Sequence, residues 1–208
     1  MYWYYWFTFA SLAICLAGCS YHIIRLIKLG MPKDYSGKAG NTKSGILYSY
    51  TKAMSPFSKE SAYLNLPTYA SGIIYHLGTF LAIVLFFVFF FTKSIISEEI
   101  TILLAVLMFI SAAFGVIILF KRLLDKKINQ LSNPDDYISN ILVTGFQAAT
   151  GVVLLIPVIY PWYLIITSLL LIYLPIGKLK HAVYFFAARI HIGYFYGWRN
   201  VWPVTKIK

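Results

Sequence analysis

Four stretches of this chain run for at least 21 residues without a charged side chain, at 3–24, 62–92, 100–120 and 137–177. A helix needs roughly 20 apolar residues to cross a hydrocarbon layer about 30 Å thick, so each stretch is long enough to span a bilayer. Charged residues make up 12% of the chain, against about 25% in soluble domains. This pattern excludes an ordinary soluble domain and a disordered chain. It predicts an all-α polytopic membrane helix bundle.

The last stretch has 41 residues, which is too long for one span and suits two, with a turn at 160–162. The second helix is expected to start at Pro67, because proline fits the first turn of a helix. Pro175 should kink the fifth helix, since it removes one backbone hydrogen bond. The sequence thus predicts five transmembrane helices in a single membrane domain over residues 1–208. Their expected ranges are 3–27, 67–92, 100–121, 138–159 and 162–190.

The basic residues are distributed very unevenly between the two expected sides of the membrane. The loop after the first helix, the third loop and the segment from Lys178 onward together hold 17 of the 18 Lys and Arg residues. Basic loops stay in the cytoplasm, so we expect the N-terminus outside and the C-terminus cytoplasmic. The location predicted is the cytoplasmic (inner) membrane. The net charge of +11 then reflects topology and attraction to anionic lipids rather than nucleic-acid binding.

The expected cytoplasmic loop 28–66 is unusually long for a connection in a compact protein. Loops of more than about 15 residues are usually functional or disordered. This one contains apolar and aromatic residues such as Ile46, Leu47, Tyr48 and Phe57. We therefore predict partial order, against either a partner or the bilayer surface.

Two of the four histidines lie within the expected second and fifth helices. At 1.5 Å per residue, His76 and His181 would each lie roughly 13 Å from the cytoplasmic boundary. Two imidazoles at one depth suit the two axial positions of a haem iron, whereas zinc prefers further donors. The alternative is that each histidine only forms a hydrogen bond with a neighbouring helix. The depth match predicts haem.

Lys178 and Lys180 lie within one helical turn of His181. Cations inside a membrane protein need anionic partners, and haem propionates would serve. The alternative is that both ammonium groups extend toward the lipid headgroups.

The motif Pro175-x-x-Lys178-Leu179-x-His181, together with His76 in the second helix, resembles the cytochrome b (gamma) subunit of respiratory nitrate reductase. It is also similar to relatives in sulfite-reductase-associated and heterodisulfide-reductase membrane complexes. The resemblance covers the whole chain in topology, but in motif only 175–181 and the surroundings of His76. It implies a haem b that carries electrons between the membrane quinone pool and a cytoplasmic iron–sulfur subunit.

The chain departs from the nitrate reductase pattern, which has two histidines in the second helix and two in the last, and two haems. Only His76 lies in the second helix here, so we expect one haem on the inner side. His22 and His191 are expected to face headgroups or the partner. A second haem between them, or a role in quinone binding and proton relay, are the alternatives.

Small and polar residues mark one surface of the expected fourth helix. Gly145 and Gly151 would allow close packing against a neighbouring helix or a porphyrin. Gln147 and Thr144 are expected to form interhelical hydrogen bonds, with a quinone carbonyl as the alternative partner.

The function expected from the sequence is that of a membrane-anchored b-type cytochrome subunit in a respiratory redox complex. It would pass electrons between menaquinone or ubiquinone and an iron–sulfur partner docked on loop 28–66 and the C-terminal tail. Such a subunit transfers electrons without being a complete enzyme, and no catalytic residue is assigned to it. The alternatives are a haem-free helical anchor for a soluble enzyme and a small transporter, for which broken helices are typical.

Overall fold

A computed structural model describes residues 2–31, 34–58, 60–92 and 97–204 of the chain, without the side chains of 60 and 61. All regular secondary structure in these ranges is helical, which confirms the predicted all-α class. The longer helices are α1 (Trp3–Leu29), α2 (Thr42–Tyr50), α4 (Leu66–Phe87), α5 (Glu98–Leu124), α7 (Pro134–Leu155), α8 (Tyr160–Tyr173) and α9 (His181–Trp198). Shorter pieces are η1 (Lys52–Met54), η2 (Pro56–Ser58), α3 (Glu60–Tyr63), η3 (Val88–Thr92), α6 (Lys126–Gln130), η4 (Pro157–Ile159) and η5 (Lys178–Lys180).

Among the described residues, four helices are long and apolar enough to cross a membrane: α1, α4 together with the π-helical turn η3, α5 and α7. The segments Pro157–Tyr173 and Lys178–Trp198 pass the same test only as a pair joined at a break. The described part of the chain thus has four candidate spans, or five if that pair counts as one. The chain is therefore a multi-pass membrane protein. Its orientation stays a prediction.

The turn between the fourth and fifth predicted helices lies a few residues earlier than expected. Helix α7 ends at Leu155 rather than near residue 159, and α8 begins at Tyr160. Ile156 has a non-helical backbone (φ −131°, ψ 80°), as expected for a residue before proline. Pro161 occupies the first turn of α8, where its missing N–H costs no hydrogen bond.

The helix predicted at 162–190 is broken at Pro175 rather than kinked. Helix α8 ends at Tyr173, and α9 starts only at His181 and continues to Trp198. The amide groups of Ile176 and Gly177 both donate to the carbonyl oxygen of Tyr173, at 3.1 and 2.8 Å. A proline and a glycine two residues apart thus close a turn that ends the helix.

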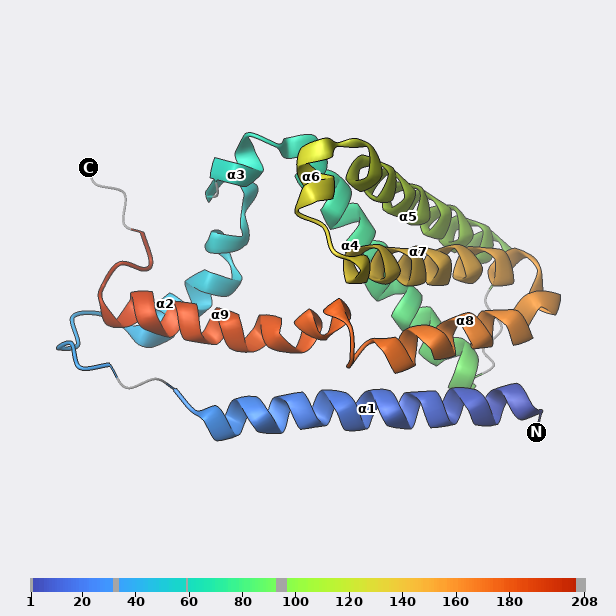
Figure 1. Cartoon of the computed structure of the whole chain (residues 1–208), viewed down its shortest axis with the longest axis horizontal. Coiled ribbons are helices and arrows are strands. Elements are labelled where there is room, and N and C mark those ends of the chain that lie inside the picture. The colour runs from blue at the N-terminus through green and yellow to red at the C-terminus, as the bar shows by residue number, and fades with distance from the viewer. Residues whose placement is uncertain (1, 32–33, 59, 93–96, 205–208) are drawn as a thin grey trace. The chain divides into compact units, whose positions relative to one another are not determined.

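Packing divides the chain into two compact units, each described here by itself. Unit 1 comprises residues 1–17 and 67–179, and unit 2 comprises 18–66 and 180–208. In unit 1, α7 packs against both α5 and α8 (Figure 1). The single membrane domain expected over 1–208 stays a prediction.

The core of unit 1 lies where α4, α5, α7 and α8 meet. Its largest fully buried apolar side chains are Met108, Phe146, Tyr163 and Leu164. Outside this core, most apolar side chains of α5 are exposed, as expected for a helix whose outer face contacts lipid.

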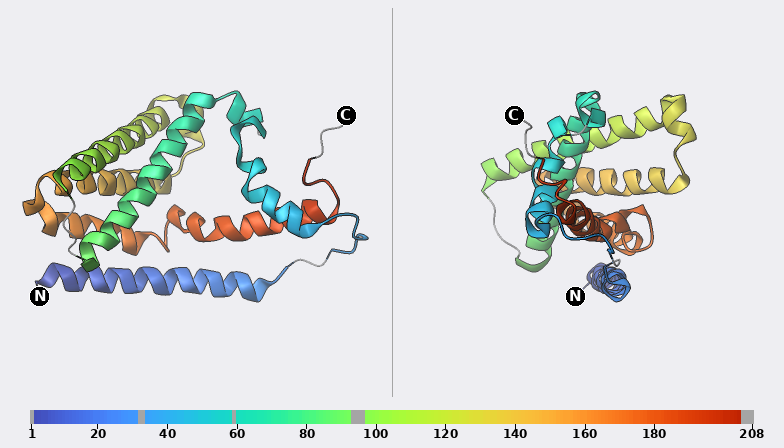
Figure 2. Two further views of the ribbon diagram at one scale, coloured as in Figure 1. Left: turned by 180° about the vertical axis from the view of Figure 1, so that it is seen from behind. Right: turned by 90° about the vertical axis from the view of Figure 1, so that its left-hand side faces the viewer.

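Unit 2 is built on direct backbone contact between α2 and α9, which lie side by side (Figure 2). A Cβ added at Gly197 would stand 2.8 Å from the carbonyl oxygen of Asn41 and 3.1 Å from the Cα of Gly45. Gly193 and Gly197 form the G-x-x-x-G spacing that lets helices approach closely. This motif is present in the sequence but was not among the predicted packing features.

Hydrogen bonds reinforce the α2–α9 contact. The hydroxyl group of Ser49, a buried residue, donates to the carbonyl oxygen of Arg189 at 2.7 Å, and Tyr50 donates to that of Phe186 at 2.7 Å. The partial order predicted for loop 28–66 is therefore present, but α2 is ordered against α9 of the same chain.

Candidate functional site

His76, the first predicted haem ligand, lies within the membrane-spanning helix α4 and is exposed in unit 1. Its ring lies 6.5 Å from that of Phe80, one turn later, at an interplanar angle of 25°. One turn earlier, a Cβ added at Gly72 would meet no atom within 4 Å. This face of α4 therefore presents the exposed imidazole of His76 one turn from a position, Gly72, where the surface of unit 1 is open.

His181, the second predicted ligand, is the first residue of α9 and follows the turn η5, which ends at Lys180. Its side chain is exposed and that of Lys180 is half-buried. The depth calculated for His181 assumed a helix ending near residue 190. Because α9 ends at Trp198, the helix end from which that depth was counted is wrong, and the depth of His181 in the bilayer stays a prediction.

The two predicted ligands belong to different units, His76 to unit 1 and His181 to unit 2. Their meeting across one iron therefore stays a prediction. Within the described residues, no three side chains of His, Cys, Asp or Glu are grouped so as to hold a metal ion.

Lys178 has an anionic partner within unit 1. Its Nζ forms an ion pair with Oδ1 of Asp136, and Nη1 of Arg122 lies 3.4 Å from Oδ2 of the same carboxylate. The chain itself thus supplies the anion that we expected Lys178 to need, so a propionate contact by Lys178 would have to share that ammonium group.

Asp136 and Arg122 were not predicted as site residues, although the sequence indicates the helix start at which Asp136 lies. Asn133 and Asp136 form a capping box, in which Asn133 Oδ1 accepts from the amide of Asp136 at 3.1 Å and Asp136 Oδ2 accepts from the amide of Asn133 at 3.0 Å. The pattern Asn-Pro-Asp-Asp before a charge-free run is a readable helix start. It predicts the cap but not the ion pairs, whose partners are distant in sequence.

Gln147 of α7 links α7 to α4 by the interhelical bonding that we expected. Its Nε2 donates to the carbonyl oxygen of Tyr75 at 2.9 Å and to Oγ1 of Thr79 at 2.7 Å. Thr79 itself donates to the Tyr75 carbonyl, so its lone pairs are available to Nε2. Both bonds are therefore donated by Nε2, and Gln147 Oε1 is a buried acceptor without a donor among the described residues.

Thr144 bonds within the same contact between α4 and α7. Its hydroxyl group lies 3.1 Å from that of Tyr75 and 3.3 Å from Oδ1 of Asn140. The interhelical interpretation of Gln147 and Thr144 thus has specific partners, whereas the quinone interpretation remains untested.

The two glycines noted in the fourth predicted helix face different surroundings. A Cβ on Gly151 would stand 3.1 Å from the ring of Phe109, so Gly151 serves the α5–α7 packing. A Cβ on Gly145 would meet no atom within 4 Å. Gly145 therefore leaves space rather than fitting a neighbouring helix.

His22 and His191 both lie in unit 2. Nδ1 of His22 is 3.0 Å from the hydroxyl group of Tyr184 in α9. His191 is half-buried and lines a cavity of about 390 Å³ together with Asp34, Phe195 and Arg199. Arg199 stacks on the Phe195 ring at 3.7 Å and donates to Asp34 Oδ2 at 2.5 Å. The Arg199 charge is thus already neutralised within this cavity.

Comparison with known proteins gives no match to this chain, whether to a family model, a curated protein or a solved structure. The geometry above and the motifs of the sequence are therefore the basis for a functional proposal.

Proposed function

We propose that the chain is a b-type cytochrome subunit of a membrane-bound respiratory redox complex, with His76 and His181 as axial ligands of one haem b. The single observation that carries the proposal is His76, an imidazole within a charge-free spanning helix that has open space one turn away at Gly72. A histidine inside a membrane span indicates a functional site by default, because polar and ionisable side chains are costly to place in hydrocarbon. The motif 175–181 supports His181 as the second ligand.

When bound, the haem supplies a one-electron couple at its iron. The chain's own residues would provide the two imidazoles, His76 from the spanning helix α4 and His181 from the start of α9. Lys178 and Lys180 lie close to His181 in sequence and would place positive charge near the propionates. Electrons would pass between menaquinone or ubiquinone and the haem.

An iron–sulfur partner is proposed to dock on unit 2, which contains loop 28–66 and the C-terminal tail. Unit 2 has 12 Lys and Arg residues and 2 acidic residues in its sequence, so it accounts for +10 of the net charge of +11. This charge favours an acidic partner surface on the proposed cytoplasmic side of the inner membrane. Loop 28–66 would act as a folded surface, since α2 already packs on α9.

The absorption spectrum of the purified protein tests the haem proposal. We expect b-type bands in the reduced-minus-oxidised difference spectrum, lost in His76→Ala and in His181→Ala. His22→Ala is the control, because Tyr184 accounts for a contact of its ring, and it should keep the bands. A colourless wild-type preparation, after expression with sufficient haem, would contradict the proposal and favour the haem-free anchor.

A further inference from the structure

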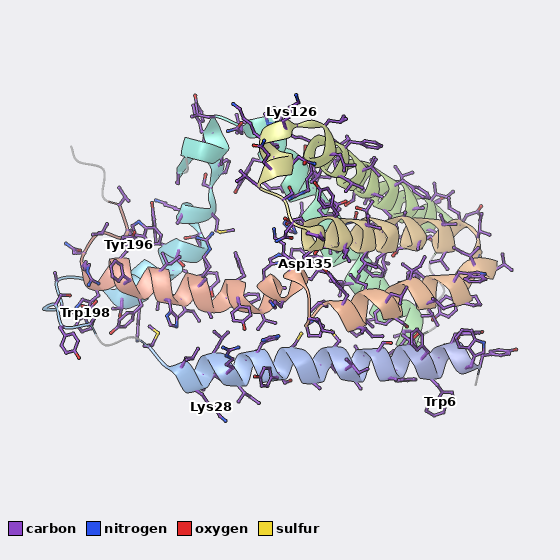
Figure 3. All side chains as sticks on the ribbon, viewed as in Figure 1. Trp6, Lys28, Lys126, Asp135, Tyr196 and Trp198 are labelled. Carbon is purple, nitrogen blue, oxygen red and sulfur yellow. The ribbon has the colours of Figure 1, made fainter. Side chains whose placement is uncertain are left out.

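The turn that precedes His181 is fixed to the first turns of α7, all within unit 1. We call this set of contacts the α7 clamp. Its members on α7 are Asp135, Asp136 and Ser139, and those after α8 are Tyr173, Gly177 and Lys178. Figure 3 labels Asp135 at the start of α7.

Tyr173 and Gly177 form the uncharged part of the α7 clamp. The Tyr173 hydroxyl group donates to the backbone carbonyl of Asp135 at 3.3 Å and lies 3.4 Å from Oγ of Ser139. A Cβ on Gly177 would stand 2.5 Å from Cε1 of the Tyr173 ring. The chain therefore folds back directly over a ring that is itself bonded to α7, and only glycine allows this approach.

Asp136 forms the charged part of the clamp. The residue is 5% exposed, and its Oδ1 pairs with Lys178 while Oδ2 accepts from the Asn133 amide and faces Arg122. A buried carboxylate is costly unless each oxygen has a partner. The Lys178 side chain is half-exposed, so its ammonium group can be solvated by water without Asp136. The buried Asp136 carboxylate has no such alternative, so breaking the ion pair would cost mainly the desolvation of Asp136.

We propose that Asp136 is a positioning residue for His181. Lys178 and His181 are separated only by the remainder of the single 3₁₀ turn η5, so holding Lys178 on α7 limits, through the chain itself, how far from α7 the backbone of His181 can lie. The role of His181 as a ligand rests on the proposed function. The fixing of the turn by Asp136 does not depend on it.

Hydrogen exchange of the full-length protein in lipid nanodiscs tests the clamp itself. Asp136→Asn keeps an acceptor for the Asn133 amide but removes the charge, and amides at 176–181 should exchange roughly tenfold faster or more. Asp135→Asn is the matched control, with the same charge change one residue away, since Asp135 contributes its backbone carbonyl. Lys178→Met should accelerate the exchange of these amides as Asp136→Asn does. Lys178→Arg keeps the positive charge and should keep the wild-type exchange rates. Equal exchange in the Asp135 and Asp136 variants would overturn the proposal.

A spectroscopic measurement tests the effect on His181. If the wild-type protein binds haem, Asp136→Asn should shift the low-spin electron paramagnetic resonance signal, and Asp135→Asn should leave it unchanged. Faster exchange with an unshifted signal would show that Asp136 holds the turn without positioning His181, which overturns the inference. A wild-type protein without haem would refute the proposed function instead, and the exchange experiment would still decide whether the clamp exists.

Discussion

Gly193 of α9 lies so close to α2 that a Cβ on it would stand 2.5 Å from the Cα of Ile46. The obstructing atom belongs to the main chain, so it cannot move away by a change of rotamer. Two hydrogen bonds connect the same pair of helices: Tyr50 donates to the carbonyl oxygen of Phe186, and Ser49 donates to that of Arg189. The contact between α2 and α9 thus depends on the absence of a side chain at one position.

Gly193→Ala should release α2 from α9. Overpacking of a tight contact costs roughly 1–3 kcal/mol, and here the backbone itself would have to shift. We expect faster hydrogen exchange throughout 42–50 and new protease sensitivity there. Gly37→Ala is the control, since a Cβ at Gly37 meets no atom within 4 Å. If Gly193→Ala and Gly37→Ala behave alike, the described contact between the helices is incorrect.

Gly115→Ala should destabilise unit 1, and Gly145→Ala should not. A Cβ on Gly115 would stand 2.5 Å from the ring of Tyr75 and 3.1 Å from Cγ2 of Thr144, where α4, α5 and α7 meet. We expect a loss of roughly 1–3 kcal/mol for Gly115→Ala. Thermal unfolding in detergent measures the difference, and an unchanged melting temperature for Gly115→Ala would contradict it.

The spanning helices were predictable because the absence of charge over at least 21 residues has few explanations. The sequence could not determine whether a proline within such a run kinks the helix or ends it. Pro175 alone predicts a kink, but Gly177 two residues later allows the chain to fold over Tyr173. Whether a turn closes there depends on Asp135 and Ser139, which lie about 35 residues earlier in the chain.

The candidate site was predictable to a similar degree. An intramembrane histidine such as His76 can be recognised from its surroundings in the sequence. The partner of Lys178 could not be recognised in this way, because the position of Asp136 in the sequence indicates only a helix-capping acid at the end of a charged loop. Gly193-x-x-x-Gly197 was readable as a packing motif, but its partner α2 lies in a segment that resembles a loop.

Replacement of Gln147 should show how the polar contact between α4 and α7 contributes to stability. Gln147→Leu removes two donated hydrogen bonds, and interhelical bonds in membranes are worth about 0.6 kcal/mol each on average. We therefore expect a loss of roughly 1–2 kcal/mol in the free energy of unfolding. Gln147→Glu should cost more at neutral pH, since a carboxylate cannot donate to the Tyr75 carbonyl and would be buried as a charge. A glutamate variant as stable as wild type would contradict this account.

Acid should release the segment that contains Asp34 from the end of α9. Hydrogen bonds from the side chain and amide of Ser36, and the adjacent Arg199, lower the pKa of Asp34 below its ordinary value of 3.8. A carboxyl group with a lowered folded-state pKa stabilises the fold above its unfolded pKa, and this contribution is lost as the pH falls through the folded pKa. The contact should thus be intact at pH 7 and weaken only below about pH 3.8.

Trp198 reports on this contact, because its Nε1 donates to the carbonyl oxygen of Ser36 at 2.9 Å. Its position near the end of α9 is labelled in Figure 3. We expect the difference in tryptophan emission between the wild type and a Trp198→Phe variant to change in acid, below pH 3.8. Asp34→Asn should show the acid-type emission already at pH 7, since it cannot form the ion pair with Arg199. An Asp34→Asn spectrum identical to that of the wild type at neutral pH would mean that the carboxylate does not hold this segment.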